Sequence, residues 1–418
     1  GCEVDETVTI NALPTIAGTL NACIGLTTQL TGSAPVAVST WSSATLGVAT
    51  VDANGLVTGV SAGTSVITYT DGNGCEVDET VTINALPTIA GTLNACIGLT
   101  TQLTGSAPVA GSTWSSATLG VATVDANGLV TAVSAGTSVI TYTDGNGCEV
   151  DETVTINALP TIAGTLSACV GLTTQLTGSA PVAGSTWSSA TLGVATVDAN
   201  GLVTAVSAGT SVITYTDGNG CEVDETVTIN ALPTIAGTLN ACIGLTTQLT
   251  GSAPVAGSTW SSATLGVATV DANGLVTAVS AGTSVITYTD GNGCEVDETV
   301  TINASSTIAG TLNACIGLTT QLTGSAPVAG STWSSATLGV ATVDANGLVT
   351  GVSAGTSVIT YTDGNGCEVD ETVTINALPT IAGTLSACVG LTTQLTGSAP
   401  VAGSTWSSAT LGVATVDA

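Results

Sequence analysis

The segment GCEVDETVTINA begins at Gly1 and returns at Gly74, Gly147, Gly220, Gly293 and Gly366, which is a period of 73 residues. A fixed period of this kind indicates an array of small structural units that follow one another along the chain. The copies differ little, as at Val38, where later copies have Gly, and at Ser305-Ser306, which replace Leu-Pro. The fold of one short unit therefore determines the fold of the chain.

The composition favours β-structure with frequent turns. There are no Lys, Arg, His, Phe or Met residues, whereas Gly alone occurs 52 times, and Thr, Ser, Ala and Val are abundant. The net charge of -29 excludes nucleic acids and anionic membrane surfaces as partners, because both require clustered cations. Charged residues make up only 7% of the chain, so it is not a disordered polyanion and should fold.

The sequence contains no block of about twenty continuous apolar residues, so no membrane insertion is expected in this segment. The chain opens inside one repeat and closes inside another. We interpret it as a part of a longer protein whose targeting segments lie elsewhere.

Alternating apolar residues predict short strands within each repeat. Ser65, Ile67 and Tyr69 share one face of a strand, and the turns Asn54-Gly55 and DGNG (71–74) supply residues that accept positive backbone angles. The first repeat is predicted to contain strands at 15–22, 27–32, 39–43, 48–52, 56–60, 64–70 and 75–84. Seven short strands with one Trp and one Tyr describe a small two-sheet sandwich.

The run TWSSATLGVATVDANGLVTGVSAGTSVITYT (40–70) resembles the bacterial immunoglobulin-like group 2 domain. The resemblance rests on the W-S-S strand, V-A-T-V-D, the N-G turn, L-V-T and A-G-T before an Ile-containing strand. The surroundings of Cys23 and Cys75 also resemble repeats of very large surface proteins of Bacteroidetes-type bacteria. These resemblances imply an immunoglobulin-like fold, a bacterial cell-surface or extracellular location, and a role in stalks of intimin-like or invasin-like adhesins.

We therefore predict an all-β chain, a tandem array of immunoglobulin-like seven-stranded β-sandwiches. Since the last strand ends at Asn84 and a Leu-Pro linker follows, the strand order sets the domain boundaries. The predicted repeats are 11–84, 85–157, 158–230, 231–303 and 304–376, preceded by an orphan last strand (1–10) and followed by the first four strands of a truncated repeat (377–418).

Two cysteines per repeat, with no His and no CxxC pair, favour disulfides in an oxidising exterior over a four-thiolate zinc site. We predict pairing within each repeat: Cys23 with Cys75, Cys96 with Cys148, Cys169 with Cys221, Cys242 with Cys294, and Cys315 with Cys367. One alternative stays open. If Cys23 and Cys75 lie at opposite ends of the sandwich, Cys23 would better reach Cys148 in the next repeat.

The acids have no cationic side chain to pair with, so they are either solvated or bound to a metal. Asp52 with Asn54 and Asp71 with Asn73, together with Glu76 and the equivalents in other repeats, form a candidate calcium site at one end of the sandwich. The alternative is that Asp and Asn occur there because they form turns. Alternation places Glu6 on the inward face, and a strand bulge that turns it outward is expected.

Catalysis usually draws on His, Lys or Arg, and the chain has none, so no enzyme activity is expected. Two functional classes remain: a structural fibre, stalk or sheath, and an adhesin whose repeats bind a host or surface ligand. We favour the fibre, with copies of the chain itself as partners. The mean hydropathy of +0.54 and the low charge further predict lateral assembly of neighbouring chains.

Overall fold

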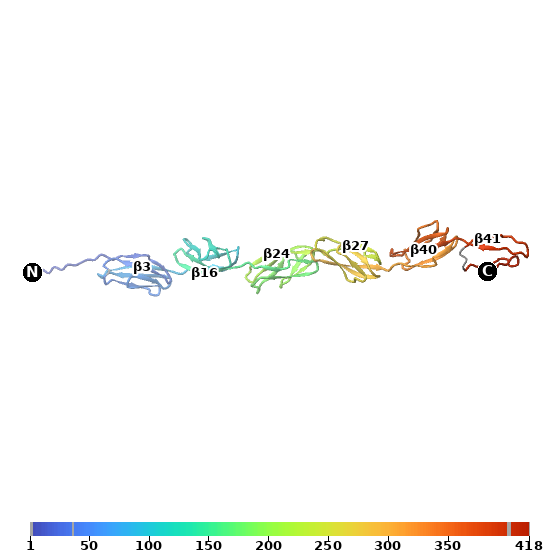
Figure 1. Cartoon of the computed structure of the whole chain (residues 1–418). Helices are drawn as coiled ribbons and strands as arrows, with labels where there is room; N and C mark the ends of the chain where they lie inside the picture. The colour runs from blue at the N-terminus through green and yellow to red at the C-terminus, as the bar shows by residue number, and fades with distance from the viewer. Residues whose placement is uncertain (1–2, 36, 399–402, 418) are drawn as a thin grey trace. The chain divides into compact units, whose positions relative to one another are not determined.

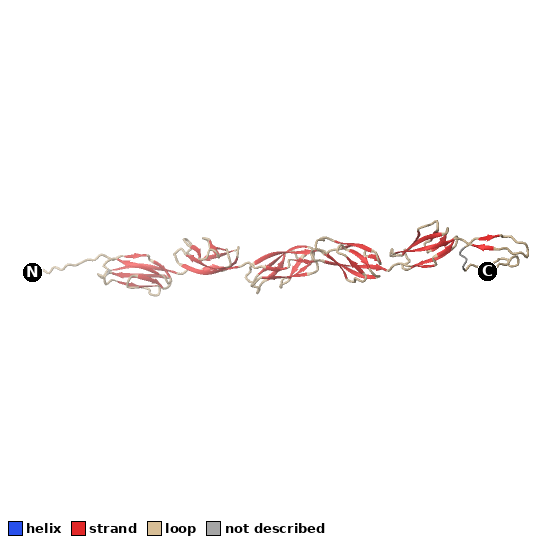
Figure 2. Cartoon of the chain, in the orientation of Figure 1, coloured by secondary structure: helices blue, strands red, loops and turns tan. Residues whose placement is uncertain are grey.

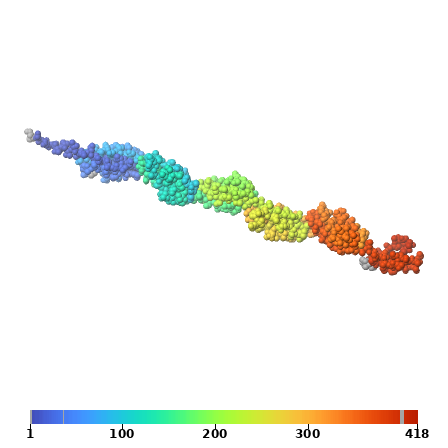
Figure 3. Space-filling model, turned by 90° about the horizontal axis from the view of Figure 1, so that it is seen from above, coloured from blue at the N-terminus to red at the C-terminus, as the bar shows by residue number. Residues whose placement is uncertain are grey.

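The computed structural model describes residues 3–35, 37–398 and 403–417. Within these residues the regular structure consists of strands joined by turns and loops (Figure 2). Five complete repeats each form a sandwich, which the labels β3, β16, β24, β27 and β40 mark in Figure 1. Each repeat is also a globule of its own in the space-filling view (Figure 3).

The strands recur in the same order in every repeat. The first repeat contains β1 (Ile16–Gly18), β2 (Asn21–Cys23), β3 (Thr27–Gly32), β4 (Thr40–Ser43), β5 (Ala49–Val51), β6 (Leu56–Gly59), β7 (Gly63–Thr70) and β8 (Glu76–Asn84). The second contains β9 (Ile89–Gly91), β10 (Asn94–Cys96), β11 (Thr100–Gly105), β12 (Thr113–Ser116), β13 (Ala122–Val124), β14 (Leu129–Ala132), β15 (Gly136–Thr143) and β16 (Glu149–Asn157). The third contains β17 (Ile162–Gly164), β18 (Ser167–Cys169), β19 (Thr173–Gly178), β20 (Thr186–Ser189), β21 (Ala195–Val197), β22 (Leu202–Ala205), β23 (Gly209–Thr216) and β24 (Glu222–Asn230).

The later repeats continue the series. The fourth contains β25 (Ile235–Gly237), β26 (Asn240–Cys242), β27 (Thr246–Gly251), β28 (Thr259–Ser262), β29 (Ala268–Val270), β30 (Leu275–Ala278), β31 (Gly282–Thr289) and β32 (Glu295–Asn303). The fifth contains β33 (Ile308–Gly310), β34 (Asn313–Cys315), β35 (Thr319–Gly324), β36 (Thr332–Ser335), β37 (Ala341–Val343), β38 (Leu348–Gly351), β39 (Gly355–Thr362) and β40 (Glu368–Asn376). The sixth has β41 (Ile381–Gly383) and β42 (Leu395–Gly397).

Each complete repeat packs two four-stranded sheets face to face. In the first repeat their strand orders are β1-β3-β6-β5 and β2-β8-β7-β4. Neighbouring strands are antiparallel except for β2, which runs parallel to β8 with Asn21 opposite Thr82 and Cys23 opposite Asn84. The all-β array of immunoglobulin-like sandwiches is thereby confirmed.

The strand count needs one correction, because the single strand predicted at 15–22 is two strands. It leaves the first sheet after Gly18 and joins the second as β2. Gly18 has a φ of 128°, and a Cβ there would overlap the carbonyl oxygen of Gln29 on β3. Glycine therefore permits both the turn and the close approach at which the strand changes sheets.

The chain's outer segments hold fewer strands than predicted. Residues 3–10 are exposed and form no strand, because no other described segment pairs with them. The sixth repeat has β41 and β42 among its described residues where four strands were expected. Counterparts of β7 and β8, against which its other segments would pair, are not part of the 418 residues.

The core lies between the two sheets. Leu30, Val57, Ile67 and Val81 are fully buried, as the predicted alternation requires. Tyr69 is buried too, and its ring packs against Trp41 with 4.6 Å between ring centroids. Its hydroxyl donates a hydrogen bond of 3.0 Å to the carbonyl oxygen of Ser33, which satisfies the one polar atom of this large side chain.

Tyr69 also explains a glycine that lies across from it. A Cβ at Gly32 would overlap the Tyr69 ring, and the same holds for Gly105 against Tyr142 in the second repeat. The φ angle of Gly32 is not positive, so its backbone conformation does not require glycine. Glycine is required here because a larger side chain would have no space. The tyrosine thus fills the sandwich up to the backbone of β3.

We predict that alanine at these glycines destabilises the array by overpacking. The positions are Gly32, Gly105, Gly178, Gly251 and Gly324, each against its tyrosine ring. We expect a loss of about 1–3 kcal/mol per repeat and a fall of about 5 °C or more in the thermal midpoint. The matched control changes Gly47, Gly120, Gly193, Gly266 and Gly339, where an added Cβ would meet open space. Equal midpoints for both sets would contradict the prediction.

A second prediction concerns Val38, which adopts a φ of 59° where the equivalent Gly111 has 81°. A β-branched residue in the left-handed region is strained by roughly 1–2 kcal/mol. Val38→Gly should therefore stabilise the first repeat by about 1 kcal/mol, raising the temperature of the calorimetric transition in which this repeat unfolds. Gly111→Val should lower the stability of the second repeat. An unchanged or lower transition for Val38→Gly would show that the loop carries no such strain.

Candidate functional site: the disulfide-linked ends of the repeats

Each sandwich has two ends formed by different loops. At the upstream end the 71–75 turn meets the loop after β3, since the Gly72 N–H donates to the Pro35 carbonyl oxygen at 2.9 Å. The chain also arrives there, because the Ser33 N–H donates to Thr15. At the downstream end the turn after β2 meets the loop after β6 through the Gly25 N–H and the Gly59 carbonyl oxygen. The chain leaves there, after Asn84.

Disulfides connect the downstream end of one repeat to the upstream end of the next. Cys23 at the end of β2 is bonded to Cys148, which immediately precedes β16, with 5.7 Å between the Cα atoms. Cys96 is bonded to Cys221, and Cys242 to Cys367, each with 5.6 Å between Cα atoms. All three pairs are separated by 125 residues in the sequence. Cys169 and Cys294 are disulfide-bonded as well.

The predicted pairing within repeats is therefore wrong, and the alternative between neighbours is correct. Cys23 lies opposite Asn84 at the last residue of β8, whereas Cys75 precedes its first residue, Glu76. A strand of this length holds its ends about 27 Å apart, far beyond disulfide reach. Among the predicted disulfide residues Cys75 and Cys315 are free thiols, and the sequence holds no residue 125 positions before Cys75 or after Cys315.

The turn that presents the downstream partner is built around a buried carboxylate. Asp144 is 3% exposed, and its Oδ1 accepts hydrogen bonds from the N–H groups of Asn146 and Cys148, both at 2.9 Å. The same two bonds recur at Asp71, with Asn73 and Cys75. A carboxylate that binds two backbone donors fixes the turn, and the turn fixes the position of the cysteine.

The other candidate calcium residues have similar roles. Asp52 Oδ1 accepts the N–H groups of Asn54 and Leu56, at 2.9 and 2.8 Å. Glu76 accepts a long hydrogen bond of 3.4 Å from the Thr70 hydroxyl. Across the described residues, no group of three or more His, Cys, Asp or Glu side chains could hold a metal ion. The geometry matches the alternative in which Asp and Asn form the turns, and calcium binding stays a prediction.

Glu79, the counterpart of Glu6 in the first complete repeat, does not lie on a bulge. The register of β7 and β8 runs without interruption from Gly63 opposite Ile83 to Thr70 opposite Glu76. Glu79 therefore keeps its place opposite buried Ile67, facing inward and half-buried. The expected outward turn is wrong, and sequence alternation alone would have placed this residue correctly. Beside it β2 pairs only with the last residues of β8, which leaves this part of β8 near the sheet edge.

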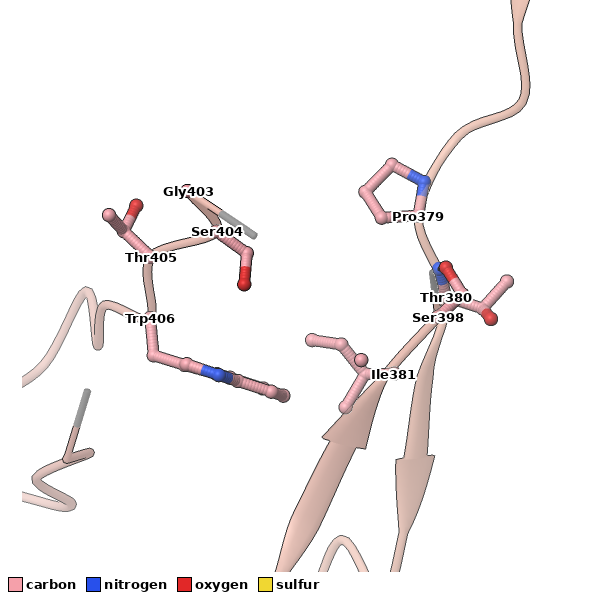
Figure 4. Close-up of a pocket in the computed structure, with 9 residues that line it drawn as sticks. Pro379, Thr380, Ile381, Ser398, Gly403, Ser404, Thr405 and Trp406 are labelled. Carbon is pink, nitrogen blue, oxygen red and sulfur yellow. The ribbon is translucent and has the colours of Figure 1, made fainter. Parts of the chain in front are cut away.

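A cavity of about 440 Å³ lies in the sixth repeat, between Pro379, Ile381, Gly397 and Trp406 (Figure 4). In complete repeats the equivalent of Gly397 contacts the ring of the buried tyrosine, as Gly32 contacts Tyr69. The sixth repeat has no such tyrosine within the 418 residues. The cavity is thus the unfilled core of an incomplete sandwich and does not indicate a ligand site.

The sandwich topology and the repeated sequence together define a tandem array of immunoglobulin-like domains. The chain matches the bacterial Ig-like domain (group 2) at residues 24–82, 97–156, 163–228, 243–302 and 315–375. It belongs to this family.

One curated relative is Ice-binding protein 1 of Shewanella frigidimarina (strain NCIMB 400), which is 31% identical over 388 residues. The match covers 78% of this chain and 42% of the relative, so the chain spans less than half of that protein's length.

Solved structures with similar folds include an intimin mutant of EHEC O157:H7 and domains 1–6 of the surface layer protein SbsC. The first is 24% identical, with 19% of this chain and 49% of that chain covered and a TM-score of 0.16. The second is 16% identical, with 87% and 63% covered and a TM-score of 0.17. At these scores the likenesses carry no argument about function.

The family, the disulfides and the curated relative point to a cell-surface or extracellular protein. No helix among the described residues is long and apolar enough to cross a membrane.

The turns at Asp52 and its equivalents lead to a pH prediction. The Leu56 N–H bonded to Asp52 holds the pKa of that carboxyl below its ordinary value of 3.8; partial desolvation opposes this lowering, and the Asn54 N–H adds to it. The pKa is lowered in the same way, chiefly by the N–H of the equivalent leucine, at Asp125, Asp198, Asp271 and Asp344. A depressed folded pKa contributes stability above 3.8, and this contribution is lost as the pH falls through the folded pKa.

Changing these five aspartates to asparagine should therefore flatten the fall of the urea midpoint between pH 5 and about pH 2–3. The control changes Asp78, Asp151, Asp224, Asp297 and Asp370 to asparagine. Their carboxylates accept a hydrogen bond of 2.6 Å from a threonine hydroxyl and, among the described residues, bond no backbone N–H group of a turn. That set removes equal charge without touching the turns. The same acid dependence in the wild-type chain and the first variant would contradict the assignment.

Proposed function

We propose that the chain is a structural part of an extracellular bacterial fibre, stalk or sheath, and that it catalyses no reaction. The observation that carries this proposal is the covalent link between successive repeats, Cys23 to Cys148 and Cys96 to Cys221. A binding module needs no such link, whereas a load-bearing or spacing element benefits from junctions that cannot separate. Near-identical sandwiches at a constant period supply length.

Exposed apolar side chains support lateral assembly with further copies. Leu26, Leu46 and Val60 are 56%, 65% and 47% exposed, and the backbone bonds of the downstream end bring their loops together. The equivalents in the other four repeats are similarly exposed. Such a patch recurring at each period presents the same weak contact many times, and the contacts add along the chain.

The outward sheet faces carry few charges to oppose this packing. In the β4-β7-β8 sheet, cross-strand rows consist of Thr40, Thr70 and Glu76, then Ser42, Thr68 and Asp78. The acids thus occupy one margin of a hydroxyl-rich face. Divalent cations could bridge the acidic margins of neighbouring chains, which is the form in which we propose a role for calcium.

A second candidate is an adhesin whose repeats bind a surface ligand directly, and the relative named Ice-binding protein 1 favours ice as that ligand. The hydroxyl rows lie about 4.8 Å apart between strands, a regular spacing suited to an ordered surface. Partitioning of the full chain into slowly growing ice tests this function. Exclusion of the chain from the ice would contradict an ice-binding function.

We predict that the purified full chain forms side-by-side bundles in negative-stain electron micrographs at high concentration. Replacing the downstream apolar residues Leu26, Leu46 and Val60 and their equivalents by serine should disperse the bundles while each repeat stays folded by circular dichroism. A control set changes Val66, Val139, Val212, Val285 and Val358 to serine; these lie on the outward face of a sheet and not in the loops that carry the three apolar residues. Separate single chains at all concentrations, with or without calcium, would contradict lateral assembly.

A further inference from the structure

Two covalent connections leave the second repeat from adjacent strands. In the second repeat β10 ends at Cys96, which lies opposite Asn157, the last residue of β16. The peptide linker to the third repeat continues from Asn157, and the disulfide to Cys221 starts at Cys96. β10 and β16 are parallel and hydrogen-bonded, so both connections leave in the same direction.

Two connections also arrive at the upstream end of the same repeat. The linker leads into β9, and the disulfide from Cys23 arrives at Cys148, one residue before β16. One covalent route therefore runs through β9 and β10 to Cys96, and a second runs from Cys148 along β16 to the linker. Strands β11 to β15 lie outside both routes.

The routes join into a continuous string across several repeats. Cys96 is bonded to Cys221, the peptide runs from Cys221 to Cys242, and Cys242 is bonded to Cys367. This string contains β24, a linker, β25 and β26, and bypasses residues 97–220 and 243–366. Its peptide part reaches at most about 75 Å, whereas the chain from Cys96 to Cys367 would reach about 900 Å without disulfides.

We propose that the interlocked disulfides limit the extension of the array, because tension runs along these strings of peptide and disulfide bonds and loads the hydrogen bonds of a sandwich only in the repeat where it passes from one string to the other. In an array without disulfides, tension is applied to the first strand of a repeat and is transmitted to the next repeat from the last strand. The sheet is then sheared, and an unfolded repeat extends to about 250 Å. Here the strands that build most of the core lie outside the strings, except in the second repeat, where the shortest covalent route from Cys148 to Cys96 runs through β11 to β15. The inference specifies the mechanical role of the proposed fibre.

Stretching the full chain between handles at its two ends tests this proposal. The shortest covalent route through the three disulfides contains about 150 residues of peptide, which limits the oxidised chain to about 500 Å. The reduced chain of 418 residues should extend to about 1,400 Å, nearly three times as far, in steps somewhat shorter than about 250 Å because the folded repeat already spans part of that length. Cys75→Ser is the matched control, since Cys75 is a free thiol and its loss should leave the 500 Å limit unchanged.

A variant with serine at every cysteine should extend like the reduced wild type without reductant. If that variant does not fold, reduction of the tethered wild-type chain gives the same comparison. Extension of the oxidised wild type beyond about 500 Å, or free thiols at Cys23, Cys96 or Cys242 in a thiol titration, would overturn the proposal. These measurements are made on single molecules. Dispersed chains in micrographs would therefore contradict lateral assembly without affecting the proposal that disulfides limit extension.

Discussion

The parallel pairing of β2 with β8 is the constraint on which the junctions depend. It exists because the first strand leaves one sheet at Gly18 and joins the other. The switch carries Cys23 to the downstream end of the sandwich, beside the residue where the chain departs. A first strand confined to one sheet would leave Cys23 without this position next to the linker.

At the upstream end, hydrogen bonds between a carboxylate and backbone N–H groups hold the partner cysteine in position for the disulfide. The buried Asp144 carboxylate accepts two N–H groups and so fixes the turn that carries Cys148. Removal of that side chain would leave two donors unsatisfied at the point where the disulfide is anchored. Of the aspartates that suggested calcium, Asp71 and its equivalents thus hold the cysteine, whereas Asp52 and its equivalents fix the turn between β5 and β6.

The core of each repeat is completed late in its sequence. Tyr69 on β7 fills the space against Gly32 on β3 and bonds the Ser33 carbonyl oxygen, across a long separation in the chain. The sixth repeat, which lacks these strands within the chain, has two strands among its described residues and a cavity where the tyrosine would lie. In the complete repeats β7 and β8 are the central strands of their sheet, between β2 and β4.

The sequence by itself determined the period, the sandwich class, the inward faces of the strands and the turns at Asp52 and Asp71, because these follow from local alternation and turn chemistry. It also placed the cysteines in an oxidising setting. The pairing of Cys23 and the division of the first strand were decided by tertiary structure. Disulfide choice depends on which strand ends are close in space, and that proximity arises from sheet topology, which local patterns do not encode.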